Sequence, residues 1–135
     1  MKKIISVVVV ATLFAMGTAT AQEPAASGAL NECYESTGDQ PRTALQPCLE
    51  RKADEATSQM TTAYNKLQAQ TKEIDSSATA QALASLRASQ EAFEAFKDAQ
   101  CQWQADAAMG GSGAGDFSSA CKVDLIRWRA QQLSD

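Results

Sequence analysis

Four cysteines are the residues whose type and spacing most clearly indicate chemistry: Cys33, Cys48, Cys101 and Cys121. An even number of cysteines in an exported chain is typical of disulfide bonds. Of the three possible pairings, Cys33–Cys48 with Cys101–Cys121 is the most economical, because each bridge then closes a short loop at one end of the chain. Each such bridge would stabilise the fold by about 3 kcal/mol. A zinc site is the alternative, and the absence of histidine and of a Cys-x-x-Cys pair argues against it.

The composition excludes most kinds of catalytic site. Without any histidine, neither a Ser-His-Asp nor a Cys-His arrangement can form. The segment Gly110–Gly115 lacks the Gly-Lys-Ser/Thr ending of a phosphate-binding loop. A carboxylate pair of the glycosidase kind remains, and its best candidates are Glu91, Glu94 and Asp98. They lie opposite an apolar stripe, which is typical of a solvated helix face. We therefore predict that the protein is not an enzyme, with no cofactor and no metal.

The first 21 residues have the order of a secretory signal peptide. Two lysines precede an apolar run from Ile4 to Met16, and small residues follow up to Ala19-Thr20-Ala21. This pattern predicts cleavage after Ala21 and a periplasmic or secreted protein, since the apolar run is too short for a permanent membrane anchor. The small and polar residues 22–29 are predicted to be a disordered lead-in. Residues 30–135 are predicted to form a single helical domain.

The charge balance of the predicted mature chain points to the class of partner. Removal of the two N-terminal lysines leaves 10 basic residues against 16 acidic ones, a net charge of −6. An acidic surface repels nucleic acid and anionic membranes, so we expect neither nucleic-acid binding nor membrane insertion. It favours cationic partners, among them many proteins that attack cell walls.

The periodicity of the apolar residues predicts an all-α fold with two long helices. Positions three or four apart, and finally seven apart, form one stripe along residues 49–74, in a helix of about 26 residues that starts near Gln46. The stripe comprises Leu49, Ala53, Ala56, Met60, Ala63, Leu67 and Ile74. A second long helix is predicted over residues 77–109. Its apolar side carries Leu83, Leu86, Phe93, Phe96 and Trp103.

Shorter helices are predicted at both ends, and no segment has the alternation of a strand. The first covers residues 30–36, and the last begins at Asp116 as N-cap and presents Phe117, Cys121, Leu125 and Trp128 on one face. The expected architecture is two long antiparallel helices, with a terminal helix stapled to each by a disulfide. The stripe along residues 49–74 would also suit an intermolecular coiled coil, so the oligomeric state stays open.

The glycine-rich segment before the last helix is the candidate partner-binding site. Its residues would be Gly110, Gly111, Ser112, Gly113 and Asp116, because glycines let a backbone approach a partner closely. A loop held by two cross-linked helices is a common way for an inhibitor to enter a cleft, although a plain flexible connection is the alternative. Trp103 and Trp128 continue apolar stripes, so we expect them in the core rather than at an interface.

Several spaced residues together resemble the LprI-like lysozyme inhibitor family. They are Phe93-x-x-Phe96-Lys97-Asp98-Ala99-x-Cys101, Gly110-Gly111-Ser112, Cys121, Arg129 and Leu133, with Cys33, Cys48, Ala53-Asp54 and Tyr64-x-x-Leu67 upstream. Three positions depart from the family pattern. Phe93 stands where tryptophan is usual, Lys97 replaces an arginine and so lacks the planar guanidinium, and Ile126 stands where threonine is common.

The resemblance implies a small exported helical protein that inhibits a lysozyme-type peptidoglycan hydrolase by binding and occluding it. It implies mainly structural roles for Phe93, Phe96, Lys97, Asp98 and Arg129. Two other functions remain open. The protein could be an immunity protein against a cell-wall-degrading toxin, or a structural module of the envelope without an enzyme target.

Overall fold

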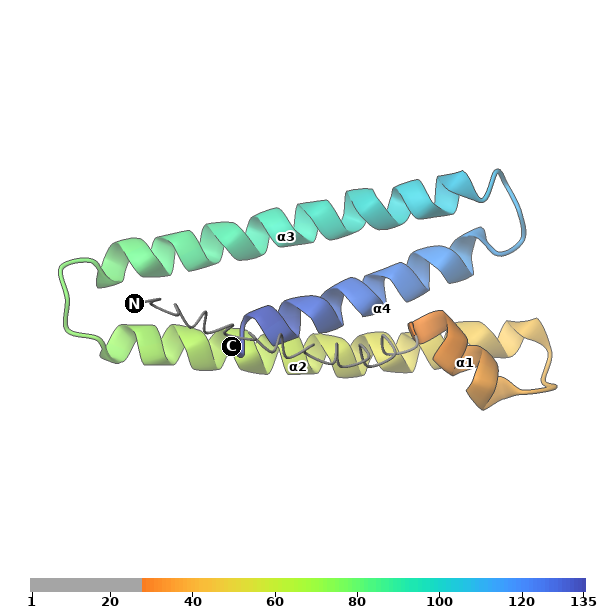
Figure 1. The fold of residues 1–135 in the computed structure, drawn as a ribbon, viewed down its shortest axis with the longest axis horizontal. Coiled ribbons are helices and arrows are strands. Elements are labelled where there is room, and N and C mark those ends of the chain that lie inside the picture. Colours follow the sequence, from red (N-terminus) through yellow and green to blue (C-terminus); the bar gives the residue numbers. More distant parts are fainter. Residues whose placement is uncertain (1–27) are drawn as a thin grey trace, which may run out of the picture.

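A computed structural model describes residues 28–135, which form four α-helices and one short 3₁₀ helix (Figure 1). In chain order these are α1 (Ala29–Thr37), η1 (Arg42–Ala44), α2 (Leu45–Glu73), α3 (Thr79–Ala107) and α4 (Ala114–Gln132). The described part of the chain contains no strand, and the predicted all-α class is confirmed. The predicted signal peptide and nearly all of the predicted lead-in lie outside these residues.

The two predicted disulfides are confirmed and connect the shorter helices to the long ones. Cys33 of α1 is bonded to Cys48 of α2, with their Cα atoms 5.8 Å apart. Cys101 of α3 is bonded to Cys121 of α4, with their Cα atoms 5.5 Å apart. Each terminal helix is therefore linked covalently to a long helix, as the economical pairing predicted.

Helix α1 begins one residue earlier than the sequence pattern predicted. Ala29 is fully buried, and its backbone N–H donates to a carboxylate oxygen of Asp124 in α4 over 2.9 Å. A carboxylate from a distant helix thus satisfies one of the amides that a helix N-terminus leaves unpaired. The helix ends where Gly38 adopts a positive φ of 51° and its N–H bonds the carbonyl of Tyr34.

Helix α2 begins at Leu45, next to the predicted start, and is 29 residues long. Pro47 therefore lies in the first turn, where its missing N–H leaves no hydrogen bond unmade. The predicted stripe is buried or partly buried from Leu49 to Leu67. Ile74 was wrongly assigned to the stripe, since it follows the last helical residue and is 60% exposed. Its backbone is extended, which takes it off the helix face.

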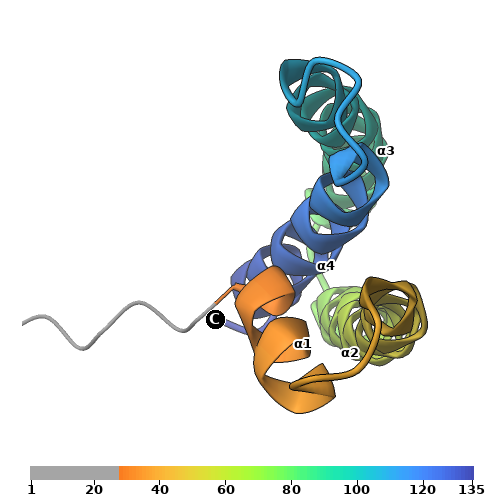
Figure 2. The same ribbon diagram turned by 90° about the vertical axis from the view of Figure 1, so that its right-hand side faces the viewer.

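Helix α4 lies between the two long helices. Figure 1 shows α2 and α3 running antiparallel, with α4 returning from the end of α3 into the space that separates them. Viewed along the helices, α3, α4 and α2 form a curved row, and α1 packs beside α2 and α4 (Figure 2). The two long helices thus meet mainly through α4 rather than face to face.

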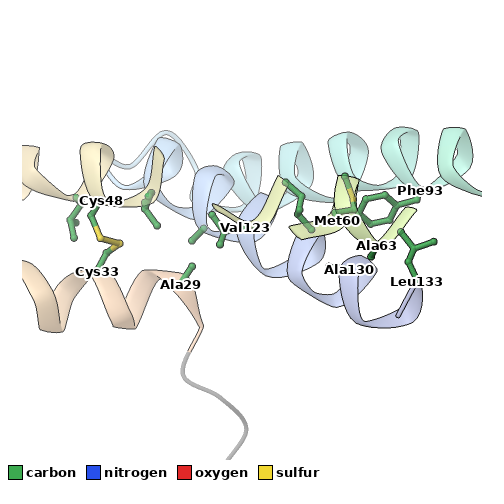
Figure 3. Close-up of a cluster of buried hydrophobic side chains, with 14 residues drawn as sticks. Ala29, Cys33, Cys48, Met60, Ala63, Phe93, Val123, Ala130 and Leu133 are labelled. Carbon is green, nitrogen blue, oxygen red and sulfur yellow. A yellow bond between two sulfur atoms is a disulfide. The ribbon is translucent and has the colours of Figure 1, made fainter. Parts of the chain in front are cut away.

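The core follows this arrangement as a strip from the Cys33–Cys48 disulfide to Phe93 (Figure 3). Helix α4 contributes Ala120, Val123, Ile126, Ala130 and the following Leu133. Of the residues predicted to share one face of this helix, Cys121 is buried and Leu125 packs against the core, whereas Phe117 and Trp128 are exposed. Because α4 has a neighbour on each of two sides, its apolar residues do not form a single stripe. No helix of the described residues is apolar and long enough to cross a membrane.

Candidate partner-binding site

The loop between α3 and α4 covers residues 108–113, about two residues earlier than predicted, because α3 ends at Ala107 and α4 starts at Ala114. Its backbone forms consecutive hydrogen-bonded turns. The N–H of Met109 donates to the carbonyl of Asp106, that of Gly111 to Ala108, and that of Ala114 to Gly111, over 2.9, 2.9 and 3.1 Å. The loop therefore has a defined shape.

Met109, directly after the C-cap of α3, has an unfavourable backbone conformation for a methionine. Its φ is 51°, in the left-handed region, and its side chain is 91% exposed. The left-handed conformation costs a residue with a Cβ about 1–2 kcal/mol. Neither burial nor backbone preference compensates that cost. Strained residues of this kind are concentrated at functional sites, and here the strain presents an apolar side chain to solvent.

Asp116 supports the loop from within the protein. Its carboxylate accepts a hydrogen bond from Nε of Arg42 over 3.0 Å and one from Nε2 of Gln46 over 2.6 Å, and the residue is 7% exposed. Gly113 is buried beneath Arg42, where an added Cβ would lie 2.4 Å from a guanidinium nitrogen. Of the predicted partner-binding residues, Gly110, Gly111 and Ser112 are thus exposed, whereas Gly113 and Asp116 are engaged inside the protein.

Four large aromatic side chains of α3 and α4 lie outside the core, contrary to the prediction for the two tryptophans. Trp103 is 63% exposed and Trp128 is 47% exposed. Phe96 and Phe117 are also more than two-fifths exposed. The side chains are exposed because α3, α4 and α2 form a row, which leaves some helix sides uncovered (Figure 2). Helix α3 has α4 on one side only, so residues on the adjoining side of its apolar stripe have no neighbouring helix to cover them.

Phe93 and Arg129 fasten α3 to α4. Phe93 is buried, its ring centroid lies 6.3 Å from that of Trp128, and the Arg129 guanidinium carbon lies 5.6 Å from the Phe93 ring centroid. Arg129 also donates to the side chains of Gln90 and Ser89, each over 3.0 Å. Arg129 thus joins the two helices by stacking on an aromatic ring of α3 and by two hydrogen bonds to side chains of the same helix.

The remaining motif residues lie on α3. Lys97 forms an ion pair with Glu94 and lies 3.9 Å from a carboxylate oxygen of Asp98. The carboxylate of Asp98 is 68% exposed, and the Phe96 ring lies at the surface.

The arrangement of these motif residues agrees with a comparison against known families. Residues 33–133 match the family described as "Lysozyme inhibitor LprI". The chain belongs to the LprI lysozyme inhibitor family. No curated protein matches the chain, and no solved structure does. The matched range contains both disulfides, the loop and the Phe93–Arg129 contact, so membership covers nearly every described element.

This LprI family member also contains a three-helix ion-pair cluster that the sequence did not reveal. Glu32 of α1 accepts two hydrogen bonds from Arg127 of α4 and one from Nζ of Lys52 of α2. Hydrogen bonds from Arg127 and then Lys52 lower the pKa of the Glu32 carboxyl from 4.5 to about 2. The same carboxylate raises the pKa of Arg127. No local sequence pattern marks this cluster, because its members are on three helices.

The carboxylates that could have formed a catalytic pair are arranged differently. Glu94 is hydrogen-bonded to Gln90 and paired with Lys97, and Glu91 is exposed to solvent. Among residues 28–135 no group of three or more His, Cys, Asp or Glu side chains could hold a metal ion. LprI proteins are classed as inhibitors rather than enzymes.

Proposed function

We propose that this LprI protein is an exported inhibitor of a lysozyme-type peptidoglycan hydrolase, and that it acts by binding and occluding the enzyme. Membership of the family supports the class of target. The observation that favours binding by occlusion is Met109 in the α3–α4 loop, which has a left-handed backbone and is almost fully exposed. A small apolar projection is suited to insertion into a cleft.

The support of the loop is suited to such a projection. The Cys101–Cys121 bond joins α3 and α4 about two helical turns from the loop. The Asp116–Arg42 pair fixes the other side, at the start of α4. A loop whose ends are held in this way loses little conformational entropy on binding, which increases affinity.

The location that we propose follows from the cysteines and the family. Both disulfides require an oxidising compartment, and lysozyme inhibitors meet their targets outside the cytosol. We propose that the first 21 residues are a signal peptide that is cleaved after Ala21, which delivers the protein to the periplasm or the exterior. The acidic mature chain would then attract a cationic hydrolase and accelerate encounter.

The test is binding and inhibition by oxidised residues 22–135 against purified c-type, g-type and i-type lysozymes, measured by calorimetry and by lysis of cell-wall suspensions. We expect at least one class to be bound and inhibited at micromolar concentration. Met109→Gly removes the projecting side chain and relieves the left-handed strain, so it should weaken inhibition by about tenfold or more without loss of stability.

Ile74→Gly is the matched control for that variant. Ile74 is also an exposed apolar residue in a turn, but it lies at the other end of the long helices. It should leave inhibition unchanged. The proposal is wrong if none of the three lysozyme classes is bound, and its assignment of Met109 is wrong if Met109→Gly inhibits as well as the parent protein.

A further inference from the structure

Two adjoining grooves follow the seam between α3 and α4 and share Gln104 and Phe117 in their walls. The larger, of about 520 Å³, reaches the start of α1 at Gly28 and Leu30, and is walled by Phe96, Gln100 and Asp124. The smaller, of about 300 Å³, lies between Trp103 and Phe117 and extends to Ala107 and Ala108. Together they form a continuous surface, which we call the aromatic face.

The aromatic face contains several aromatic rings that are exposed to solvent instead of being packed in the core. Phe96, Trp103 and Phe117 line it, and each is more than two-fifths exposed. Trp128 follows Asp124 by about one turn of α4 and so lies on the same side. Contiguous exposed apolar surface marks interaction sites, and tryptophan is enriched where interfaces are strongest.

We infer that the aromatic face is where the inhibitor anchors its hydrolase, and that it receives a hydrolase segment with an arginine or lysine beside apolar side chains. This inference rests on the proposed function. It adds the main contact surface and the chemistry of the segment that the surface fits.

The size of the loop requires such a second surface. A specific interface buries about 800 Å² on each partner, contributed by about 20–30 residues. The loop has six residues, 108–113, and two of its glycines offer little area. The aromatic face begins at Ala107 and Ala108, directly beside the loop, so the two form one uninterrupted contact surface.

The charge of the face indicates a cationic segment. Among residues 28–135, Asp124 is the only charged residue in the walls of the two grooves, and neither lysine nor arginine of this range lines them. The other polar wall residues are the amides of Asn31, Gln100 and Gln104. A guanidinium can stack on exposed rings and pair with a carboxylate at once, which an ammonium does less well.

The nearby cations of the inhibitor do not neutralise this surface. Arg129 is stacked on Phe93 and bonded to α3, and Arg127 is paired with Glu32. Lys97 is paired with Glu94. Asp124 accepts the N–H of Ala29, and its charge helps to raise the pKa of Arg127, but among residues 28–135 it forms no ion pair and so can pair with a cationic partner.

The test uses the lysozyme class that the full mature chain binds best, with five variants. Trp103→Ala and Phe96→Ala should each weaken binding by about tenfold or more, whereas Tyr34→Ala, at an aromatic residue of similar exposure on α1, should not. Gln100→Lys and Gln100→Glu differ little in size and only the first places a cation in the groove. We expect Gln100→Lys to weaken binding and Gln100→Glu to preserve or strengthen it, with the difference shrinking at high salt.

The possible outcomes distinguish failure of this inference from failure of the proposed function. If the lysozyme is bound and no aromatic variant weakens it, this inference is wrong and the proposed function stands. If Gln100→Glu weakens binding more than Gln100→Lys, the inference that the bound segment is cationic is wrong. If the protein is a dimer by sedimentation and Trp103→Ala makes it a monomer, the face belongs to a second copy of this chain. If no lysozyme is bound at all, the proposed function and the inference both fail.

Discussion

Glu32 and Arg127 are 95 residues apart in the chain, yet the guanidinium of Arg127 donates two hydrogen bonds to the Glu32 carboxylate, over 2.8 and 3.0 Å. Nζ of Lys52 donates a third, over 2.6 Å. Bidentate pairing of this kind is stronger than a single ion pair. One carboxylate thereby connects α1, α2 and α4 on the side of the molecule where α1 has little apolar area to bury.

The ion-pair cluster around Glu32 should make the free energy of unfolding depend on pH. The pKa of Glu32 is about 2 in the folded protein, against 4.5 as its ordinary value. The ionised form is thus favoured by folding, so the stabilisation is complete above about pH 4.5 and is lost as the pH falls toward 2. Since the carboxylate remains one-quarter exposed, solvent screening reduces its contribution to about 1–2 kcal/mol.

We expect the free energy of unfolding, measured by urea denaturation between pH 2 and 7, to decrease as the pH is lowered from about 4.5 to about 2. The Glu32→Gln variant should be less stable at pH 7 and should lose less stability on acidification. Glu35→Gln, at an exposed carboxylate on the same helix, is the control and should follow the parent curve. Parallel curves for the parent protein and Glu32→Gln would show that Glu32 does not titrate as described.

Removal of each disulfide should lower stability, but only removal of the Cys101–Cys121 bond should also weaken lysozyme inhibition. Each bridge closes a loop of 15 or 20 residues and should stabilise the fold by about 3 kcal/mol on the chain-entropy model. The paired change Cys101→Ala with Cys121→Ala also releases the helices that hold the Met109 loop. It should weaken lysozyme inhibition, whereas Cys33→Ala with Cys48→Ala should lower only stability. Thermal unfolding and inhibition at a temperature where both variants are folded provide the measurement.

Equal loss of inhibition in the two pairs would contradict the idea that the Cys101–Cys121 bond organises the contact surface. Reduction of the unaltered protein provides a check, since it should reproduce the summed loss of stability.

Asp116 should matter for stability rather than for partner binding. Its buried carboxylate is bonded to Arg42, which is about half exposed, and to Gln46. Asp116→Ala should therefore cost about 1–3 kcal/mol in urea denaturation. In a double-mutant cycle, Arg42→Ala should cost little more once Asp116 has been replaced. Asp98→Ala, at an exposed carboxylate, should be nearly neutral.

Lysozyme affinity of the folded Asp116→Ala protein should stay closer to the parent value than that of Met109→Gly, because the Cys101–Cys121 bond still holds the loop and no contact side chain is lost. A large loss of affinity with unchanged stability would instead make Asp116 a contact residue, as its place in the glycine-rich segment suggested.

The local elements could be predicted because their causes lie within a few residues. The apolar repeat from Leu49 to Leu67 specifies one side of a helix, and glycine at 110 and 111 ends the next helix wherever the chain goes. The disulfide pairing followed from economy of loop closure. The family resemblance followed from motif spacing, and both were confirmed.

Periodicity placed Trp103 and Trp128 in the core, whereas the structure places both side chains at the surface. Periodicity shows which residues share a side of a helix, but it does not show whether another helix covers that side. The prediction for Ile74 was wrong for a related reason. The apolar repeat does not show that α2 ends at Glu73, one residue before Ile74.

The sequence by itself determined the helices, their approximate ends, both cross-links and the family. Tertiary structure decided the rest: the insertion of α4 between α2 and α3, the burial of Asp116, the cluster around Glu32 and the aromatic face. All four depend on contacts between residues at least 70 positions apart or on neighbours that are missing on one side of a helix. Burial is a property of what packs against a residue, and that is settled only when the helices come together.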